Sequence, residues 1–180
     1  MKATSKGAFT VQEVLHMQEM GTISDGERFE LIEGAIVPMH ARPHEHELIK
    51  SALSMGFARR LPEGLWLGVA TTIYLSDDTF VEPDLVIYPR GIKLEEVKGA
   101  DIVLAIEVAV TSFAYDSGFK AQLYARHRVF EFWVVDAAER CAYVHTAPSA
   151  NGWEKVIEYG PQENLVCAAI PGFSMRLGTI

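Results

Sequence analysis

The chain has 180 residues, of which 49% are hydrophobic and 22% are charged, and its formal net charge at pH 7 is −8. This length and apolar content predict one folded domain over residues 1–180 and exclude an intrinsically disordered chain. The acidic charge counts against broad, non-specific binding of nucleic acid, although it does not exclude a local basic patch.

The composition also indicates where the protein works. No apolar run approaches the length of about 18 residues that spans a bilayer, so we expect no membrane segment. The opening residues, MKATSKGAF, lack the apolar segment of a secretory signal. Cys141 and Cys167 fit no metal-binding spacing and are expected to be free thiols. We therefore expect a protein of the reducing cytoplasm.

The N-terminal third is predicted to contain a helix, a hairpin and a longer helix. Thr10–Glu13 has the pattern of a capping box and starts an amphipathic helix. Arg28–Glu33 and Ala35–Met39 are predicted to be two short strands that turn near Gly34. The apolar residues between His46 and Leu61 have helical spacing, which predicts a second helix.

Two polar features of this region invite a functional interpretation. Glu30 lies within the first predicted strand, and its simplest role is that of an acid on a solvated strand face. His40, His44 and His46 fall within seven residues, which suggests a zinc site. The intervening Pro43 and the helix that follows favour a polar loop and a helix start instead.

The middle of the chain is predicted to form two strands joined by a turn. Leu65–Leu75 is predicted to be one strand, and Ser76–Thr79 has the polar side chains of a tight turn. Phe80–Tyr88 is the next predicted strand, and Pro83 within it indicates an edge or a bulge. Asp84 follows this break, a place where strands often redirect a functional side chain.

The stretch from Asp101 to Asp136 is predicted to form the central strand–helix–strand unit of the fold. DIVLAIEVAV and VFEFWVVD are predicted to be buried strands. Between them, Phe119, Leu123 and Tyr124 have the spacing of a helix of about three turns. Strand, helix and strand in roughly 35 residues make a βαβ-sized unit, which joins parallel strands covered on both faces.

The C-terminal part is rich in predicted strands. Strands are expected at Arg140–Thr146, Trp153–Tyr159 and Leu165–Ala169, and a turn followed by a strand is expected within Pro171–Ile180. Together with the two longer helices they predict a mixed α/β or α+β domain.

Glu107 is out of place in its strand. It lies between Ile106 and Val108, where an unpaired carboxylate costs several kcal/mol. It therefore needs a cation, a metal, a proton or water as a partner. An arginine such as Arg126 or Arg128 is the simplest structural partner.

Asp84 and Glu107 also suggest a catalytic site. Two carboxylates from neighbouring strands can share a hard cation such as magnesium, which activates water and offsets charge on a phosphate. Lys120, four residues after Asp116 on the predicted helix, can hold that water or stabilise charge. The set suits metal-dependent phosphodiester hydrolysis. As the simpler alternatives, Asp116 and Lys120 form an i,i+4 pair on the helix surface, and Asp84 is a turn former.

The order and spacing of several motifs resemble the bacterial Uma-two family. The motifs are FELIEG, a histidine opening a helix at His46, EPDLVIY and IEVAVTSFAYDSGFKAQLYARHRVFEFWVVD, and the resemblance covers roughly residues 10–175. That family belongs to the PD-(D/E)XK nuclease-like superfamily. The resemblance implies a restriction-endonuclease-like α/β fold, with a mixed central sheet flanked by helices, and a nuclease that uses Mg²⁺ or Mn²⁺.

The resemblance also implies roles for the acidic residues and the lysine. Pro83–Asp84 matches the PD of the pattern, and Glu107 matches its second acid, so these two acids would be the metal ligands. Ala109 stands where the pattern has lysine. The resemblance implies that the lysine has moved to the following helix as Lys120, where it positions or activates the water.

Further residues match or depart from the family pattern. Glu30 matches a family glutamate that would support a ligand or a second ion, and Tyr124 matches a tyrosine after the lysine. His46 and Asp116 are expected to support the site from behind. Val110 stands where the family often has Asp, so one polar group near the site is missing.

A second function from another class competes with the nuclease. The acidic charge and the absence of a basic run favour a nuclease fold that has lost catalysis and serves as a binding or assembly module. The apolar and aromatic strands of the tail would then supply an interface. We accordingly expect a homo-oligomer.

Overall fold

The protein is described by a computed structural model that covers residues 8–24, 26–39 and 41–180. His40 and residues 1–7 lie outside the described residues. The expected lack of a secretory signal largely depends on residues 1–7. No helix in the described ranges has both the length and the apolar character needed to cross a bilayer.

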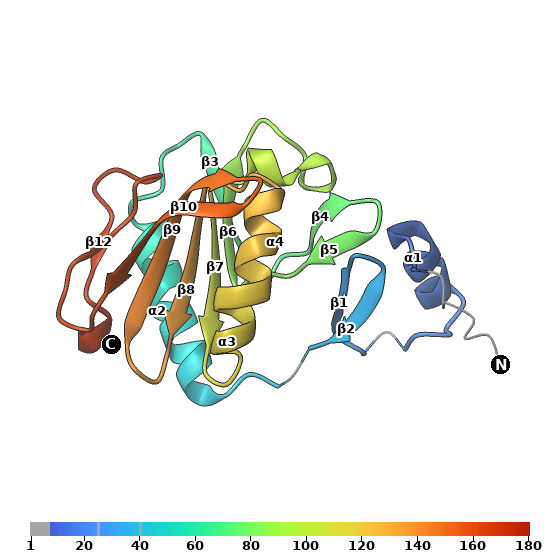
Figure 1. Ribbon diagram of the computed structural model, residues 1–180, viewed down its shortest axis with the longest axis horizontal. Helices are drawn as coiled ribbons and strands as arrows, with labels where there is room; N and C mark the ends of the chain where they lie inside the picture. The colour runs from blue at the N-terminus through green and yellow to red at the C-terminus, as the bar shows by residue number, and fades with distance from the viewer. Residues whose placement is uncertain (1–7, 25, 40) are drawn as a thin grey trace.

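A six-stranded mixed sheet forms the centre of the fold, in the order β10-β9-β8-β7-β6-β3 (Figure 1). Its strands are β3 (Leu65–Val69), β6 (Leu85–Pro89), β7 (Leu104–Ala109), β8 (Glu131–Asp136), β9 (Cys141–Ser149) and β10 (Gly152–Tyr159). Strands β7 and β8 are parallel, as the predicted βαβ unit requires, and the other neighbouring strands are antiparallel. The predicted mixed central sheet is therefore confirmed.

Helices cover both faces of this sheet (Figure 1). On one face, α2 (His44–Ala58) packs through Leu53 and Phe57 against alternate side chains of β6, β7 and β8. The other face is covered by a helical segment built from α3 (Phe113–Tyr115), a π-helical turn (Asp116–Lys120) and α4 (Ala121–Arg126). Because strand side chains alternate between faces, each helix layer buries its own half of the same strands.

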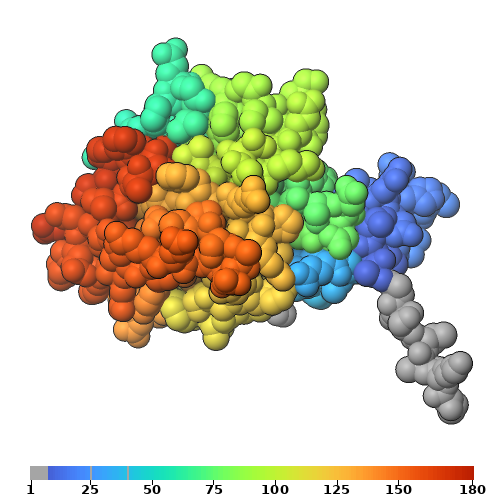
Figure 2. All heavy atoms as spheres, turned by 45° about the horizontal axis from the view of Figure 1, so that its top comes forward, coloured from blue at the N-terminus to red at the C-terminus, as the bar shows by residue number. Residues whose placement is uncertain are grey.

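A smaller four-stranded sheet lies beside the central one, in the order β2-β1-β5-β4. It contains β1 (Phe29–Ile32), β2 (Ala35–Pro38), β4 (Ile73–Ser76) and β5 (Thr79–Val81). Helix α1 (Val11–Glu19) begins at the predicted capping box and packs on this sheet through Val14. In the space-filling view, the N-terminal segment and the small sheet form a lobe at one side of the molecule (Figure 2).

Two predicted strands are in fact split between the sheets. Leu65–Leu75 was expected to be continuous, but Ala70 has a φ of 46°, and the chain passes there from β3 to β4. Phe80–Tyr88 breaks around Pro83, as the proline indicated, and passes from β5 back to β6. The first crossing is hard to see in the sequence because Val69, Ala70 and the apolar residues of β4 follow one another closely, whereas Pro83 marks the second. Asp84 lies at the second crossing.

Other boundaries differ by a few residues. Helix α2 ends at Ala58 rather than Leu61. The predicted strand Leu165–Ala169 is wrong beyond its first two residues, since β11 covers Leu165–Val166 and pairs with β12 (Ser174–Met175). Short 3₁₀ turns occupy Leu94–Glu96, Gly99–Asp101 and Leu177–Thr179. Cys141 and Cys167 are buried free thiols, as predicted.

The packing of α2 on the sheet gives a test of the fold. Phe57 is fully buried, and its ring stacks on Phe173 with ring centroids 3.9 Å apart. We expect Phe57→Ala to lower the free energy of unfolding by about 3–5 kcal/mol and the melting temperature by roughly 6–20 °C. The exposed Met55, on the same helix, is the control, and Met55→Ala should change stability by less than about 0.5 kcal/mol. Equal effects in thermal denaturation would contradict this packing.

Candidate active site

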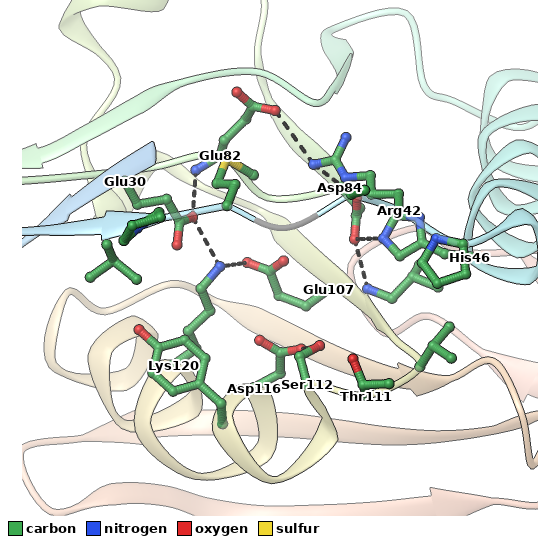
Figure 3. Close-up of a pocket in the computed structure, with 18 residues that line it drawn as sticks. Glu30, Arg42, His46, Glu82, Asp84, Glu107, Thr111, Ser112, Asp116 and Lys120 are labelled. Atoms are coloured by element: carbon green, nitrogen blue, oxygen red, sulfur yellow. Dashed lines mark hydrogen bonds and ion pairs between the residues drawn. The ribbon is translucent and has the colours of Figure 1, made fainter. Parts of the chain in front are cut away.

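A pocket of about 160 Å³ opens where the small sheet, the central sheet and the α3 segment meet (Figure 3). Most of its polar lining comes from the acids and bases that the sequence singled out. These polar residues are Glu30, Arg42, His46, Glu82, Asp84, Glu107, Thr111, Ser112, Tyr115, Asp116 and Lys120.

Asp84, directly before β6, and Glu107, within β7, lie side by side on neighbouring strands. Strands β6 and β7 pair Leu85 with Ile106, and the same antiparallel register continued by one residue places Asp84 opposite Glu107. The backbone N–H of Val108 donates a hydrogen bond to Asp84 Oδ2 at 2.9 Å. Both carboxyl groups are buried and line the pocket. The structure thus brings the two predicted acids together.

Lys120 is the partner of Glu107. Its Nζ donates to Glu107 Oε1 at 3.0 Å and to Glu30 Oε1 at 2.9 Å (Figure 3). The hydroxyl of Tyr124 donates to the same Glu107 oxygen at 2.8 Å. Glu30 also accepts the backbone N–H of Glu82 at 2.8 Å. Glu30 is therefore a buried ion-pair partner, and its interpretation as an acid on a solvated strand face is wrong.

The proposed arginine partners of Glu107 are also wrong. Arg126 instead forms an ion pair with Glu33, with nitrogen and oxygen 2.8 Å apart, and both side chains are largely exposed. Arg128 lies at the turn after α4, with a φ of 61°. A lysine from the π-helical turn reaches the strand acid because that turn directs its side chain inward.

Asp116 and Lys120 do not form a surface pair. Both side chains are buried, and Asp116 accepts a hydrogen bond from Ser112 Oγ at 2.5 Å. The backbone N–H of Ala121 bonds to the carbonyl of Asp116, an i→i+5 bond that marks the π-helical turn. Such turns are frequent at functional sites. The turn places one acid and one base of this helical segment in the pocket lining.

His46 and Arg42 contact Asp84 from the side of α2. His46 Nε2 lies 3.0 Å from Asp84 Oδ2, and Arg42 Nη2 lies 3.4 Å from Asp84 Oδ1. Arg42 also lies 3.4 Å from Glu82, which in addition pairs with Arg28. Within the described residues, Asp84 Oδ1 is the one buried side-chain oxygen or nitrogen that makes no hydrogen bond.

The electrostatics of the pocket follow from burial and from neighbouring charges. Burial raises the pKa of Glu107 well above its usual value, although the charge of Lys120 opposes this shift. Burial lowers the pKa of Lys120, but the carboxylates of Glu107 and Glu30 outweigh it and raise the pKa above its usual value. Burial also raises the pKa of Asp84, but the hydrogen bond and charge of His46 outweigh it, so this pKa is lowered.

The pocket has more acids than bases. Burial raises the pKa of Asp116, which adds a further carboxyl group to those of Glu30, Asp84 and Glu107. Among the described lining residues, the permanently charged cations are Arg42 and Lys120. Glu82 also lines the pocket but pairs with Arg28, so four other carboxyl groups, two of them with a raised pKa, share these two cations. The pocket is therefore suited to a divalent cation.

The two described histidines of the histidine-rich segment, His44 and His46, do not form part of a metal-binding group. His46 contacts Asp84, and His44 opens helix α2. No group of three or more His, Cys, Asp or Glu side chains in residues 8–24, 26–39 and 41–180 is arranged to hold a metal ion. Because His40 lies outside those residues, the zinc site stays a prediction.

The sequence analysis missed several residues of the pocket. Ser112 and Thr111 directly follow β7, and a loop at the carboxyl end of a parallel strand is a common position for site residues. Their position after a predicted parallel strand is the feature of the sequence that could have identified Thr111 and Ser112. Arg42 and Tyr115 also line the pocket. Arg42 lies in an irregular loop before α2, where periodicity carries no signal.

Comparison with known proteins supports a nuclease-like fold. A family described as "Uma2: Putative restriction endonuclease" matches residues 11–178. A crystal structure from Anabaena variabilis, titled as a "putative nuclease belonging to DUF820", is similar with a TM-score of 0.74 and 14% sequence identity. The similarity covers 94% of this chain and 96% of that chain. At this identity the likeness shows the fold alone. No curated protein matches the chain in sequence.

The ion pairs of Lys120 give a test of the site as built. Lys120→Met would leave Glu30 and Glu107 buried without their cation, and we expect a loss of about 3–5 kcal/mol in the free energy of unfolding. Denaturant unfolding measures this loss. The matched control is Lys93→Met, because Lys93 is exposed and lies 3.9 Å from Glu96, and we expect a change below about 0.5 kcal/mol. A Lys120→Met protein as stable as the wild type would contradict the description of the site.

Proposed function

The chain belongs to the Uma2 family, and from this membership and the pocket geometry we propose that it is a divalent-metal-dependent nuclease that hydrolyses phosphodiester bonds. One observation carries the proposal. Asp84 and Glu107, from the adjoining ends of two strands, line one small pocket together with the buried ammonium group of Lys120. We assign the lysine of the PD-(D/E)XK pattern to Lys120.

The oxygens of the pocket fit a hard cation. Asp84 Oδ1 is buried and makes no hydrogen bond, and the guanidinium of Arg42 lies 3.4 Å from it. The hydrogen bonds to Glu107 converge on Oε1, which leaves Oε2 without a donor among the described residues. Mg²⁺ is usually held by one or two carboxylates, with waters and substrate phosphates completing the shell. A pair of ligands therefore suffices, and we propose Asp84 and Glu107 as the ligands of Mg²⁺ or Mn²⁺.

The chain's own residues have distinct roles in the proposed reaction. A divalent ion would supply charge neutralisation on the phosphate and a lower pKa for a nearby water. Lys120, with its raised pKa, remains an ammonium group. It therefore donates hydrogen bonds to the water or the phosphate and stabilises developing charge, rather than accepting a proton.

The surrounding residues hold these groups in place. Glu30 and Tyr124 fix Lys120 and Glu107 through hydrogen bonds. His46 fixes the orientation of Asp84. Asp116, at the other end of the π-helical turn from Lys120, adds negative charge to the pocket. We propose all four as residues that position the reacting groups.

A non-catalytic assembly module is the second candidate. Lys120 and Arg42 already pair with Glu107 and Asp84, so the acids are partly neutralised by the chain itself. The edge strand β3 carries exposed Trp66 and Val69, and the opposite edge strand β10 carries exposed Val156. Exposed apolar edges suit pairing between copies of the chain, and we propose a homo-oligomer. The buried free thiols suit a reducing compartment, so we also propose a cytoplasmic location.

Metal binding can be tested without a substrate. We expect Mg²⁺ or Mn²⁺ to raise the melting temperature, since a ligand at ten times its Kd stabilises by about 1.4 kcal/mol, or roughly 3–6 °C for a chain of this size. Asp84→Asn should abolish this shift by removing a ligand charge. Asp77→Asn, at an exposed aspartate outside the pocket, should retain it. If the Kd is roughly millimolar, metal at about 10–20 mM is enough to produce this shift. A wild type that shows no shift at that concentration argues against the metal site.

Cleavage tests the reaction itself. We expect nicking of plasmid DNA, or cleavage of RNA, in Mg²⁺ or Mn²⁺, and a reduction of about 10²–10³-fold in Glu107→Gln and in Lys120→Arg. Lys120→Arg keeps the positive charge and thus the fold, while it changes the donor geometry. Lys93→Met should cleave like the wild type.

Two other outcomes have clear meanings. Cleavage that is unchanged in both pocket variants would come from a contaminating nuclease. A wild type that binds metal but cleaves neither DNA nor RNA favours the assembly module, and size-exclusion chromatography with light scattering then determines its oligomeric state.

A further inference from the structure

We propose that Tyr115 and Phe119 form a stacking platform for an unpaired nucleobase next to the phosphate in the pocket, so that the substrate is single-stranded at the site. This inference rests on the proposed nuclease function and deepens it by naming the class of substrate. The platform is defined as these two side chains.

The two rings are stacked and open to solvent. Their centroids lie 5.5 Å apart with an interplanar angle of 19°. The exposed fractions are 38% for Tyr115 and 41% for Phe119, although aromatic side chains of this size are usually more buried. Exposed aromatic rings are the groups on which nucleobases stack in proteins that bind single strands, and each ring of this pair keeps the face that its partner does not cover.

The platform is continuous with the pocket. Tyr115 lines the pocket at the end of α3, and Phe119 directly precedes Lys120 in the π-helical turn. Lys120 is directed inward to Glu107 while Phe119 is exposed. One short segment therefore carries both the ammonium group proposed to contact the phosphate and the rings proposed to contact the base.

The open shape of the pocket lets a base reach Tyr115. A volume of about 160 Å³ corresponds to roughly five water molecules at about 30 Å³ each. This space is enough for a phosphate group with its water and ion. Because the pocket is open, a base attached to that phosphate can extend to Tyr115, which lines the pocket and is partly exposed.

The charge of the protein makes stacking the more important contact. The net charge is −8, and both described cations of the pocket, Arg42 and Lys120, pair with carboxylates. Phosphate contacts from lysine and arginine are therefore few, although they normally supply most non-specific affinity. Stacking needs no cation. In a duplex the faces of the bases are covered by their neighbours, so the platform would select unpaired bases.

Binding of short oligonucleotides tests the platform. Fluorescence anisotropy would use a labelled 12-nucleotide single strand, as DNA and as RNA, and the matched duplexes, in Ca²⁺, which prefers oxygen ligands as Mg²⁺ does. We expect the single strand to bind more tightly than the duplex. Phe119→Leu should raise the Kd for the single strand about 5- to 150-fold, because it keeps apolar bulk and removes the aromatic face. Phe119→Trp, which keeps an aromatic face, should bind the single strand with a Kd close to that of the wild type.

A matched control and a modified probe separate stacking from a structural effect. Phe130, 56% exposed, precedes β8 and so lies at the end of the sheet opposite the pocket, and Phe130→Leu should leave the Kd unchanged. A single strand of the same length that is abasic at every position should bind wild type and Phe119→Leu equally. Comparing the Kd values of the DNA strand and the RNA strand shows which of the two nucleic acids the platform binds.

Several results would overturn the platform. Equal Kd values for single strand and duplex, with no change in Phe119→Leu, would do so and would leave the nuclease function intact wherever cleavage persists. A change from dimer to monomer in Phe119→Leu, with its Kd unaltered, would assign the rings to a second copy of the chain. Failure to bind any oligonucleotide would also reject the platform, whereas the nuclease proposal is judged separately by cleavage and by the metal-induced melting shift.

Discussion

The buried ammonium group of Lys120 is the interaction on which the pocket depends. It joins Glu30 of the small sheet to Glu107 of the central sheet, and it comes from the helical segment that covers the central sheet. Removing the ammonium would leave both carboxylates buried without their cation, which costs several kcal/mol, and removing one carboxylate would leave the ammonium with the other alone. The pocket therefore forms only when all three parts of the fold have docked, and its geometry is fixed before any ligand arrives. Preorganised charge of this kind does not have to reorient during a reaction.

The second constraint is the pair of crossings between the sheets. The chain leaves the central sheet at Ala70 and returns at Asp84, and the backbone N–H of Ala70 donates to the carbonyl of Asp84 at 3.0 Å. The two crossings thus lie side by side and fix each other. Because the return occurs one residue before β6 begins, the Asp84 side chain emerges next to Glu107, where β7 also nears its end. The split of two apparently continuous strands, which looks like an irregularity of the fold, is what places the two acids together.

Local patterns predicted most of the fold, and the remaining differences have physical causes. The capping box at Thr10, the hairpin at Gly34 and the βαβ unit are set by short-range chemistry and were confirmed. The split at Ala70 was missed because apolar residues continue on both sides of it. For the site, a carboxylate inside an apolar strand was an informative signal, but an incomplete one. Glu131 in β8 is as buried as Glu107, yet it lies outside the pocket and accepts hydrogen bonds from Trp133 Nε1 and the backbone N–H of Ala169. Sequence shows that such an acid needs a partner, and only the fold shows which partner it has.

The contrast between these two strand acids bears on function. Both oxygens of Glu131 accept hydrogen bonds from the chain, so its carboxyl group ties the C-terminal segment to the sheet, and it does not line the pocket. In the pocket, Asp84 Oδ1 makes no hydrogen bond and has only the ion-pair contact with Arg42 Nη2 at 3.4 Å, although a buried oxygen without a hydrogen bond costs about 1–3 kcal/mol. A fold that satisfies every other buried side-chain polar atom in its described residues could have satisfied this one with a small substitution. Proteins retain such local costs mainly where a ligand relieves them. An oxygen that has only the Arg42 guanidinium beside it and no hydrogen bond therefore supports the proposed cation site, because the stability of the fold alone gives no reason to keep it.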